Sequence, residues 1–277
     1  MEFWKEVLRI LDLRMETPTA FGWFHLMFFI ASIAAGVLLC VFHKKENEKT
    51  VRRIVFWVAV AVAVLEIYKQ INYSFGYEGE TIEFDYQWYI FPFQFCSTPM
   101  IVGLLSAVFK KGRIHKALMA YLATYAIFAG ICVMIYPGDV FISTIGINIQ
   151  TMICHGSMIT IGIYLLGTEY VKLEHKTVLY AIPVFACFVV CAAVMNEIAY
   201  LSGLLETETF NMFFISPYCE PSLPVYSSVQ AVVPFPWCLF IYVTVFSFAA
   251  YLIVLASMGI RKLAAVIKSA RSKAQEV

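Results

Sequence analysis

The chain has 277 residues, of which 61% are apolar and 14% are charged, and its formal net charge is +1. Its mean hydropathy of +0.77 lies well above the range of soluble globular domains, which excludes an ordinary soluble enzyme. A membrane bundle would use nearly all of these residues, so we expect one domain without a soluble enzymatic module. The near-zero net charge identifies no partner, and we expect no nucleic-acid binding.

Residues 1–20 are predicted to form an interfacial amphipathic segment. Apolar residues recur at helical spacing from Phe3 to Leu11, and charged residues such as Glu2 and Lys5 lie on the opposite face. Acidic residues interrupt the apolar run and no small-residue cleavage site follows. The segment therefore does not resemble a secretory signal.

Seven apolar stretches follow, and each is long enough to cross a bilayer. The hydrocarbon core needs about 20 helical residues with few charges. The stretches that meet this criterion are 22–42, 54–73, 88–109, 115–136, 146–167, 178–203 and 234–260. We therefore predict an all-α polytopic membrane protein whose seven-helix bundle occupies residues 21–260.

Between the stretches, lysine and arginine occur only in alternate connections, and this bias predicts the orientation. They follow the first, third, fifth and seventh stretches, as Lys44, Lys45, Lys49, Arg52, Arg53, Lys110, Lys111, Arg113, Lys116, Lys172, Lys176, Arg261, Lys262, Lys268, Arg271 and Lys273. The connections 74–87, 137–145 and 204–233 contain neither residue type. We therefore expect a multi-pass protein of the plasma membrane, with its amino terminus outside and a basic cytoplasmic tail at 261–277.

Reactive and ionisable side chains within the stretches gather in the outer half of the bilayer. At about 1.5 Å per helical residue, Cys96 lies about 12 Å below the outer end of the third stretch, and His155 lies at nearly the same depth in the fifth. Glu66 and Glu197 lie below the outer ends of the second and sixth stretches, and His25 lies near the start of the first. Intramembrane ionisable groups are costly, so this shared depth predicts a functional site.

Helical spacing predicts which polar groups face the interior of the bundle. The side chains that share such faces are Glu66, Lys69, Asn148, Thr151, His155, Asn196 and Glu197. Since polar groups that face lipid are costly, we expect them to line a polar chamber that opens outward. Alternatively, Glu66 and Lys69, at i and i+3, only neutralise each other and hold helices together.

Cys96 lies between two prolines in the run Phe91-Pro92-Phe93-Gln94-Phe95-Cys96-Ser97-Thr98-Pro99. Pro99 cannot donate to the carbonyl of Phe95, so a kink is expected beside the thiol. His155 is the only imidazole at matching depth, which predicts a nucleophile and base pair, with Glu66 or Glu197 orienting the ring. Taken singly, a buried cysteine such as Cys96 is usually an apolar filler, and a histidine such as His155 is more often an interhelical hydrogen bonder. Cys154 points about 100° away from His155 on a helix and is predicted to be filler.

The connection at 204–233 is long and rich in aromatic residues and prolines. This composition favours an ordered cap over the chamber and argues against disorder. A packed loop with no gating role is the alternative.

The chain lacks the familiar motifs of metal, nucleotide and serine-hydrolase sites. No CxxC pair, HExxH, GxSxG, GxGxxG or phosphate loop occurs in the sequence. We therefore predict no cofactor and no metal.

Several short motifs together resemble the YwaF family of bacterial integral membrane proteins, which is distantly related to the transmembrane protein 164 group of animals. The motifs are Phe24-His25-Leu26, Pro92-Phe93-Gln94-Phe95-Cys96-Ser97, His155-Gly156, Asn211-Met212-Phe213-Phe214 with Pro224, and Pro234-Phe235-Pro236-Trp237. Their order and spacing extend the resemblance from about Phe21 to Ile260.

The resemblance implies a lipid-acting enzyme. The animal relatives look like ether-phospholipid acyltransferases that use an intramembrane cysteine with a histidine, and related androgen-inducible proteins are lipid hydrolases. Matched by motif, the cysteine corresponds to Cys96 and the histidine to His155. Many bacterial members read Leu-His-Leu-Cys where this chain reads Phe93-Gln94-Phe95-Cys96, so Gln94 replaces a histidine that could have served as a base or ligand.

Two hypotheses from different classes remain open. In the first, an acyltransferase or hydrolase forms a thioester on Cys96, uses His155 as its base and takes membrane lipids from the outer leaflet. In the second, a transporter or receptor binds a small polar ligand in the same chamber. In both, His25, Gln94 and Asn211 are supporting or binding residues. The sequence indicates no particular substrate or oligomeric state.

Single-cysteine labelling tests the predicted orientation. On a background without reactive cysteines, Gly79→Cys should react with an impermeant thiol reagent on intact cells, because 74–87 is predicted to lie outside. Glu46→Cys should react only after permeabilisation. The reverse pattern would move the candidate site to the opposite leaflet.

Overall fold

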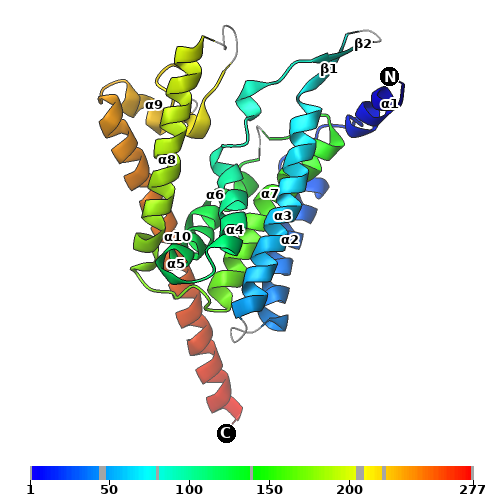
Figure 1. Ribbon diagram of the computed structural model, residues 1–277. Coiled ribbons are helices and arrows are strands. Elements are labelled where there is room, and N and C mark those ends of the chain that lie inside the picture. The colour runs from blue at the N-terminus through cyan, green and yellow to red at the C-terminus, as the bar shows by residue number, and fades with distance from the viewer. Residues whose placement is uncertain are drawn as a thin grey trace.

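The computed structural model describes residues 2–43, 48–78, 81–137, 140–203, 209–219 and 223–275, and these residues form mostly long helices (Figure 1). The helices and strands are α1 (Glu2–Leu11), α2 (Trp23–Phe42), α3 (Glu48–Asn72), β1 (Phe75–Glu78), β2 (Thr81–Phe84), α4 (Thr98–Val108), α5 (Gly112–Tyr121), α6 (Ile127–Ile135), α7 (Ile145–Gly167), α8 (Thr177–Ser202), α9 (Pro224–Gln230) and α10 (Phe235–Gln275). A π-helical turn at Leu122–Ala126 joins α5 to α6.

Six helices in the described part of the chain are long and apolar enough to cross a membrane. They are α2, α3, the continuous helix from α5 to α6, α7, α8 and α10. The prediction of an all-α polytopic membrane protein is therefore confirmed. The count of seven crossings and the orientation stay predictions, and the labelling positions Glu46 and Gly79 lie outside the described residues.

The third predicted stretch, 88–109, is not one continuous helix, and that prediction was wrong. It contains 3-10 turns at Trp88–Ile90 and Phe95–Ser97, and only then the 11-residue helix α4. Pro92 explains the break, because a proline disfavours helical geometry in the residue before it, and Phe91 has a ψ of 134°. Pro99 itself lies in the first turn of α4, where its missing N–H costs nothing. The helical rise used to place Cys96 at depth therefore does not apply before Phe95.

Side chains bind the backbone carbonyl groups that this break leaves free. The pairs are Gln94 Nε2 with Tyr89 O at 3.2 Å, Gln70 Nε2 with Ile90 O at 3.0 Å, Thr98 Oγ1 with Phe95 O at 2.8 Å and Cys154 Sγ with Cys96 O at 3.7 Å. Thr98 thus replaces the donor that Pro99 lacks. Backbone groups away from water need such partners, so the break is built into the bundle.

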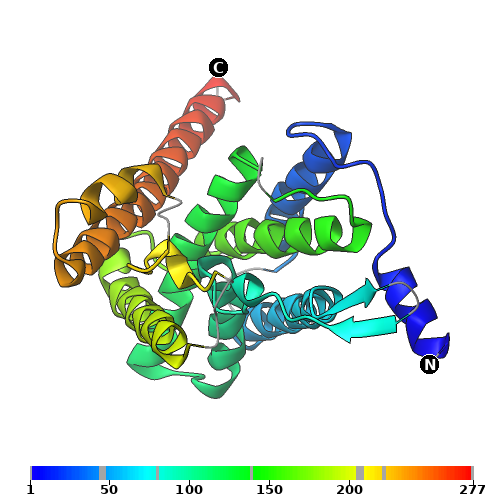
Figure 2. The same ribbon diagram turned by 90° about the horizontal axis from the view of Figure 1, so that it is seen from above.

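Helix α7 forms the centre of the bundle. It packs against α2, α3 and α6, whereas α8 packs against α5 and α10 on the other side (Figures 1 and 2). About 72% of the residues in the most apolar 18-residue segment of α7 are buried, compared with 17% in α2. Glycines allow close approach at these contacts: a Cβ built on Gly130 of α6 would lie 2.7 Å from the His155 carbonyl oxygen of α7.

The connection between α8 and α10 is packed into the bundle where it is described. Two hydrogen bonds join the Asn196 side chain of α8 to the backbone of Met212. Asn196 Nδ2 donates to the Met212 carbonyl at 3.1 Å, and Asn196 Oδ1 accepts from the Met212 N–H at 2.8 Å. Phe213 is fully buried, has a φ of 59° and stacks on Phe95 with ring centroids 5.7 Å apart. Residues 204–208 and 220–222 of the predicted cap lie outside the described residues.

Both ends of the chain are helical. Helix α1 covers residues 2–11 of the segment predicted at 1–20, and Leu11 O at its end accepts from Tyr68 OH at 2.6 Å. The antiparallel strands β1 and β2, which the sequence analysis did not predict, lie beside α1 (Figure 2). Helix α10 continues through the basic tail, whose described residues from Ile260 onward are exposed.

Gly130→Ala should loosen the contact between α6 and α7. The added methyl group would overlap the His155 carbonyl oxygen, and overpacking of this kind costs roughly 1–3 kcal/mol. Thermal unfolding in detergent should show a lower Tm than wild type. Gly259→Ala on α10 is the matched control, because a Cβ there meets nothing within 4 Å. Equal Tm values for the two variants would contradict the close approach.

Candidate functional site

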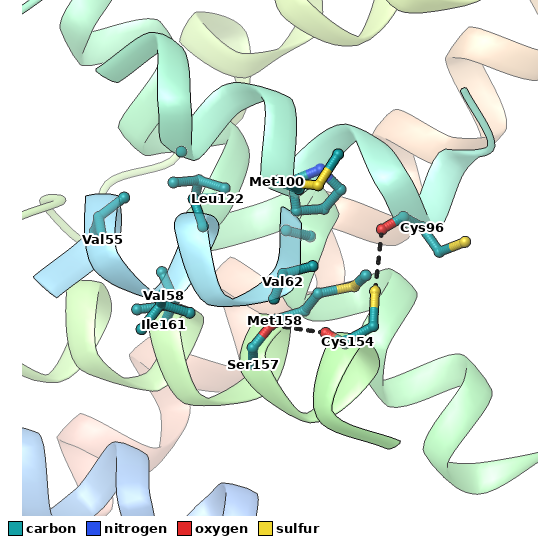
Figure 3. Close-up of a pocket in the computed structure, with 14 residues that line it drawn as sticks. Val55, Val58, Val62, Cys96, Met100, Leu122, Cys154, Ser157, Met158 and Ile161 are labelled. Carbon is teal, nitrogen blue, oxygen red and sulfur yellow. Dashed lines mark hydrogen bonds between the residues drawn. The ribbon is translucent and has the colours of Figure 1, made fainter. Parts of the chain in front are cut away.

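Cys96 lies in the 3-10 turn directly before α4, beside the middle of α7. The Cys154 thiol donates to the Cys96 carbonyl oxygen at 3.7 Å (Figure 3). Because Cys154 directly precedes His155, this contact places the turns that carry Cys96 and His155 side by side. The Cys96 sulfur points away from the Cys154 thiol (Figure 3). Cys154, predicted to be filler, therefore also holds the Cys96 backbone.

His155 is buried, with 6% of its surface exposed, and its ring is fixed by its own helix. Nδ1 lies 2.8 Å from the carbonyl oxygen of Thr151. A carbonyl can only accept, so Nδ1 carries the proton and a neutral ring keeps an unprotonated Nε2. The sequence analysis expected a carboxylate to orient this ring, but the Thr151 carbonyl occupies that position. No hydrogen bond joins Cys96 and His155 among the described side chains.

Glu66 is the centre of a buried polar network between α3 and α7. Lys69 Nζ lies 2.8 Å from Glu66 Oε1, Gln70 Nε2 donates to the same oxygen at 2.8 Å, and Gln150 Nε2 donates to Oε2 at 3.3 Å. The Thr151 hydroxyl donates to Gln150 Oε1 at 3.3 Å, so the network reaches the residue that orients His155. Glu66 and Lys69 form the neutralising pair that was considered as an alternative. Lys69 also lies within electrostatic range of Cys96 and His155.

Gln150 was missed by the sequence analysis. The polar stripe predicted on α7 contains Asn148, Thr151 and His155, and Gln150 lies beside it on the helix. The available signal was an uncharged amide within an apolar span, since such a group needs a buried partner. Tyr86, also missed, donates to Gln70 Oε1 at 2.7 Å.

Three predicted asparagines bind backbone and hold loops in place. Asn148 donates to Ile142 O at 2.7 Å and accepts from its N–H at 3.0 Å. Asn196 binds the backbone of Met212 through the two hydrogen bonds described above, and Asn211 Oδ1 accepts from the N–H of Ser216 at 2.9 Å. These contacts favour positioning roles for all three side chains.

The remaining predicted residues have other surroundings. Glu197 accepts from Tyr218 OH at 2.6 Å, on a helix that packs against α5 and α10. Nδ1 of the fully buried His25 accepts from the N–H of Phe21 at 3.0 Å. Gln94 binds Tyr89 O through its amide nitrogen, and its buried Oε1 has no hydrogen-bond partner in the described structure. The structure thus brings Cys96, His155, Glu66, Lys69 and Thr151 into one region and leaves Glu197 in another.

The cavity beside Cys96 is small and mostly apolar. Its volume is about 30 Å³, and side chains of α3, α4 and α7 line it, including Val62, Met100 and Met158 (Figure 3). Its volume corresponds to about one or two water molecules. The cavity at Cys96 thus differs from the open polar chamber expected there, because Glu66 and its partners fill the polar layer with their own hydrogen bonds. In the described chain no three metal-ligating side chains gather into a cluster.

Glu66→Gln should destabilise the protein through Lys69. Breaking one partner out of a buried ion pair costs roughly 3–5 kcal/mol, because the remaining charge stays in a poor environment. Denaturant or thermal unfolding in detergent should show this loss. The double variant Glu66→Gln with Lys69→Met should recover part of it. Additive losses in the double variant would contradict a coupled pair.

Comparison with known proteins identifies the chain at the level of a family. No curated protein and no solved structure matches it. The family model described as the TMEM164 family matches residues 20–254, which include every buried element of the candidate site. This match covers most of the 277 residues, and the chain belongs to the TMEM164 family.

Proposed function

We propose that the chain is a lipid-acting enzyme, an acyltransferase or a hydrolase, in which Cys96 is the nucleophile and His155 the base. The observation that carries this proposal is the hydrogen bond between His155 Nδ1 and Thr151 O. It holds the proton on Nδ1 and leaves Nε2 as the basic atom, in a turn that lies beside the turn of Cys96. A general base oriented by a third group is the arrangement that thiol nucleophiles require.

The proposed reaction begins with transfer of the Cys96 proton to His155 Nε2. The sulfur attacks the carbonyl carbon of a lipid ester, a C–S bond forms, the C–O bond breaks, and Nε2 returns the proton to the leaving lipid alcohol. A second lipid alcohol then takes the acyl group from sulfur in a transferase, or water takes it in a hydrolase. Both routes regenerate the thiol without an oxidant or cofactor. Lys69 would stabilise the anionic sulfur, and its pairing with Glu66 moderates that effect.

Rotation about the Cys96 side chain is part of this proposal. No hydrogen bond joins the thiol to the imidazole among the described residues, and contacts in an empty site are commonly longer than in a substrate complex. Rotation about the Cα–Cβ bond moves the sulfur and leaves the backbone hydrogen bonds of the 3-10 turn that contains Cys96 in place. We place the reaction in the outer leaflet of the plasma membrane, in a seven-crossing chain of the YwaF type.

A second candidate is binding or transport of a small polar ligand. The observation that favours it is the buried network of Glu66, Lys69, Gln70 and Gln150 at membrane depth. Intramembrane ion pairs commonly mark ligand or ion pathways. Against this candidate, the cavity beside Cys96 is lined mostly by apolar side chains and offers a polar ligand few partners.

An activity-based acyl probe separates the two candidates. Wild type should form a covalent adduct at Cys96, and Cys96→Ala should form none. Cys132→Ala is the matched control, since Cys132 is an exposed cysteine on α6 and should leave labelling unchanged. Protection by a polar solute, with no labelling, would favour binding or transport.

Conservative substitutions separate catalysis from packing. Cys96→Ser keeps nearly the same volume with a weaker nucleophile, and His155→Gln keeps hydrogen bonding without useful basicity. Both should lower lipid turnover by at least about 100-fold, the usual minimum for general base catalysis, with Tm close to wild type. Full activity in both stable variants would return Cys96 to the role of apolar filler.

A further inference from the structure

A groove at the other end of the bundle is independent of the candidate site. It lies between α6, α7 and α10 and has a volume of about 420 Å³, within the usual range for small-molecule sites. Its walls are apolar, with Ile127 and Ile131 from α6, Ile163 from α7 and Ile253 from α10. Cys96 does not line it, so its occupant need not be a substrate.

The groove is apolar along its walls and has a pair of charged side chains at one end, its mouth. From Ile253 to Arg261 it follows α10 for eight residues, or about 12 Å. At the mouth, the Arg261 guanidinium pairs with the Glu169 carboxylate, which follows the end of α7. An amphiphile with its head at the ends of the helices and its chain along them matches this gradient.

The ion pair at the mouth can open to a ligand at small cost. The Arg261 and Glu169 side chains are 55% and 37% exposed. Exposed ion pairs contribute little to stability, so a ligand that offers each charge a new partner loses little by separating them. Arg261 would bind a phosphate through its planar set of donors. Glu169 would bind an ammonium group.

We propose that this groove binds a zwitterionic phospholipid with a primary ammonium head group. The acyl chain lies along Ile127, Ile163 and Ile253, the phosphate binds Arg261 and the ammonium group binds Glu169. An anionic head group that carries no cation would place its phosphate near the Glu169 carboxylate, which it would repel. A quaternary ammonium group cannot donate a hydrogen bond to that carboxylate. Ethanolamine phospholipids therefore fit the two charges best.

Native mass spectrometry of the full chain tests this site. The protein is released from detergent with phosphatidylethanolamine, phosphatidylcholine or phosphatidylglycerol of identical acyl chains. Phosphatidylethanolamine should be retained most, and phosphatidylglycerol at least several-fold less. Arg261→Gln should lower retention of all three lipids. Glu169→Gln should remove the preference for ethanolamine over glycerol.

A filled groove gives a steric test of the same site. Ala256 lines the groove, and Ala256→Phe should lower retention of phosphatidylethanolamine several-fold. Leu255→Phe, one residue earlier on the same helix and outside the groove, is the matched control and should retain it. Unchanged Tm values verify folding, and Arg261→Gln supplies the second test if Ala256→Phe unfolds.

Three results would overturn the proposal. They are equal retention of the three head groups, equal retention by Ala256→Phe and Leu255→Phe, and a dimer that carries no lipid, which would assign the groove to a second copy of the chain.

Discussion

The structure around the candidate site depends on the hydrogen-bonding demand of a broken backbone at membrane depth. Lipid offers no partners to peptide groups, so each carbonyl that a helix does not satisfy must be satisfied by a side chain. Before α4, the side chains of Gln70, Gln94, Thr98 and Cys154 meet this demand. Two of them belong to neighbouring helices, so the break fixes how α3, α4 and α7 approach one another.

This demand links the packing of the bundle to its polar network. Gln70 donates both to Ile90 O, in the broken segment, and to the Glu66 carboxylate. The Glu66 carboxylate also pairs with Lys69 and accepts a hydrogen bond from Gln150. Gln150 in turn accepts from the hydroxyl of Thr151, and the Thr151 carbonyl orients His155. A buried charge is tolerated only with such partners. The polar network therefore connects the break before α4 to the turn of α7 whose Thr151 carbonyl orients His155.

The two halves of the bundle differ in how they are held. Around α7, glycines and buried amides bring helices into close contact. Where α10 passes α6 and α7, between Ile253 and Arg261, a groove remains, and an exposed ion pair between Arg261 and Glu169 lies at its mouth. Lipid can fill such grooves at small cost because their walls are apolar. Chemistry that needs fixed geometry is thus expected at α7, and exchangeable lipid contacts are expected at α10.

The sequence alone determined six long apolar helices, the amphipathic helix α1 and the i,i+3 pair of Glu66 and Lys69. Each is local, since transfer into lipid is decided by about 20 consecutive residues and helical spacing fixes near neighbours. Pro99 also marked the loss of a hydrogen bond beside Cys96. Only the tertiary structure decided that 88–97 is not α-helical, that Cys154 binds the Cys96 carbonyl, and that Gln150 rather than Glu197 joins the network around Glu66. Those outcomes depend on which helices meet and at what height, because the partner of a buried polar group is chosen by proximity in space and not by spacing along the chain.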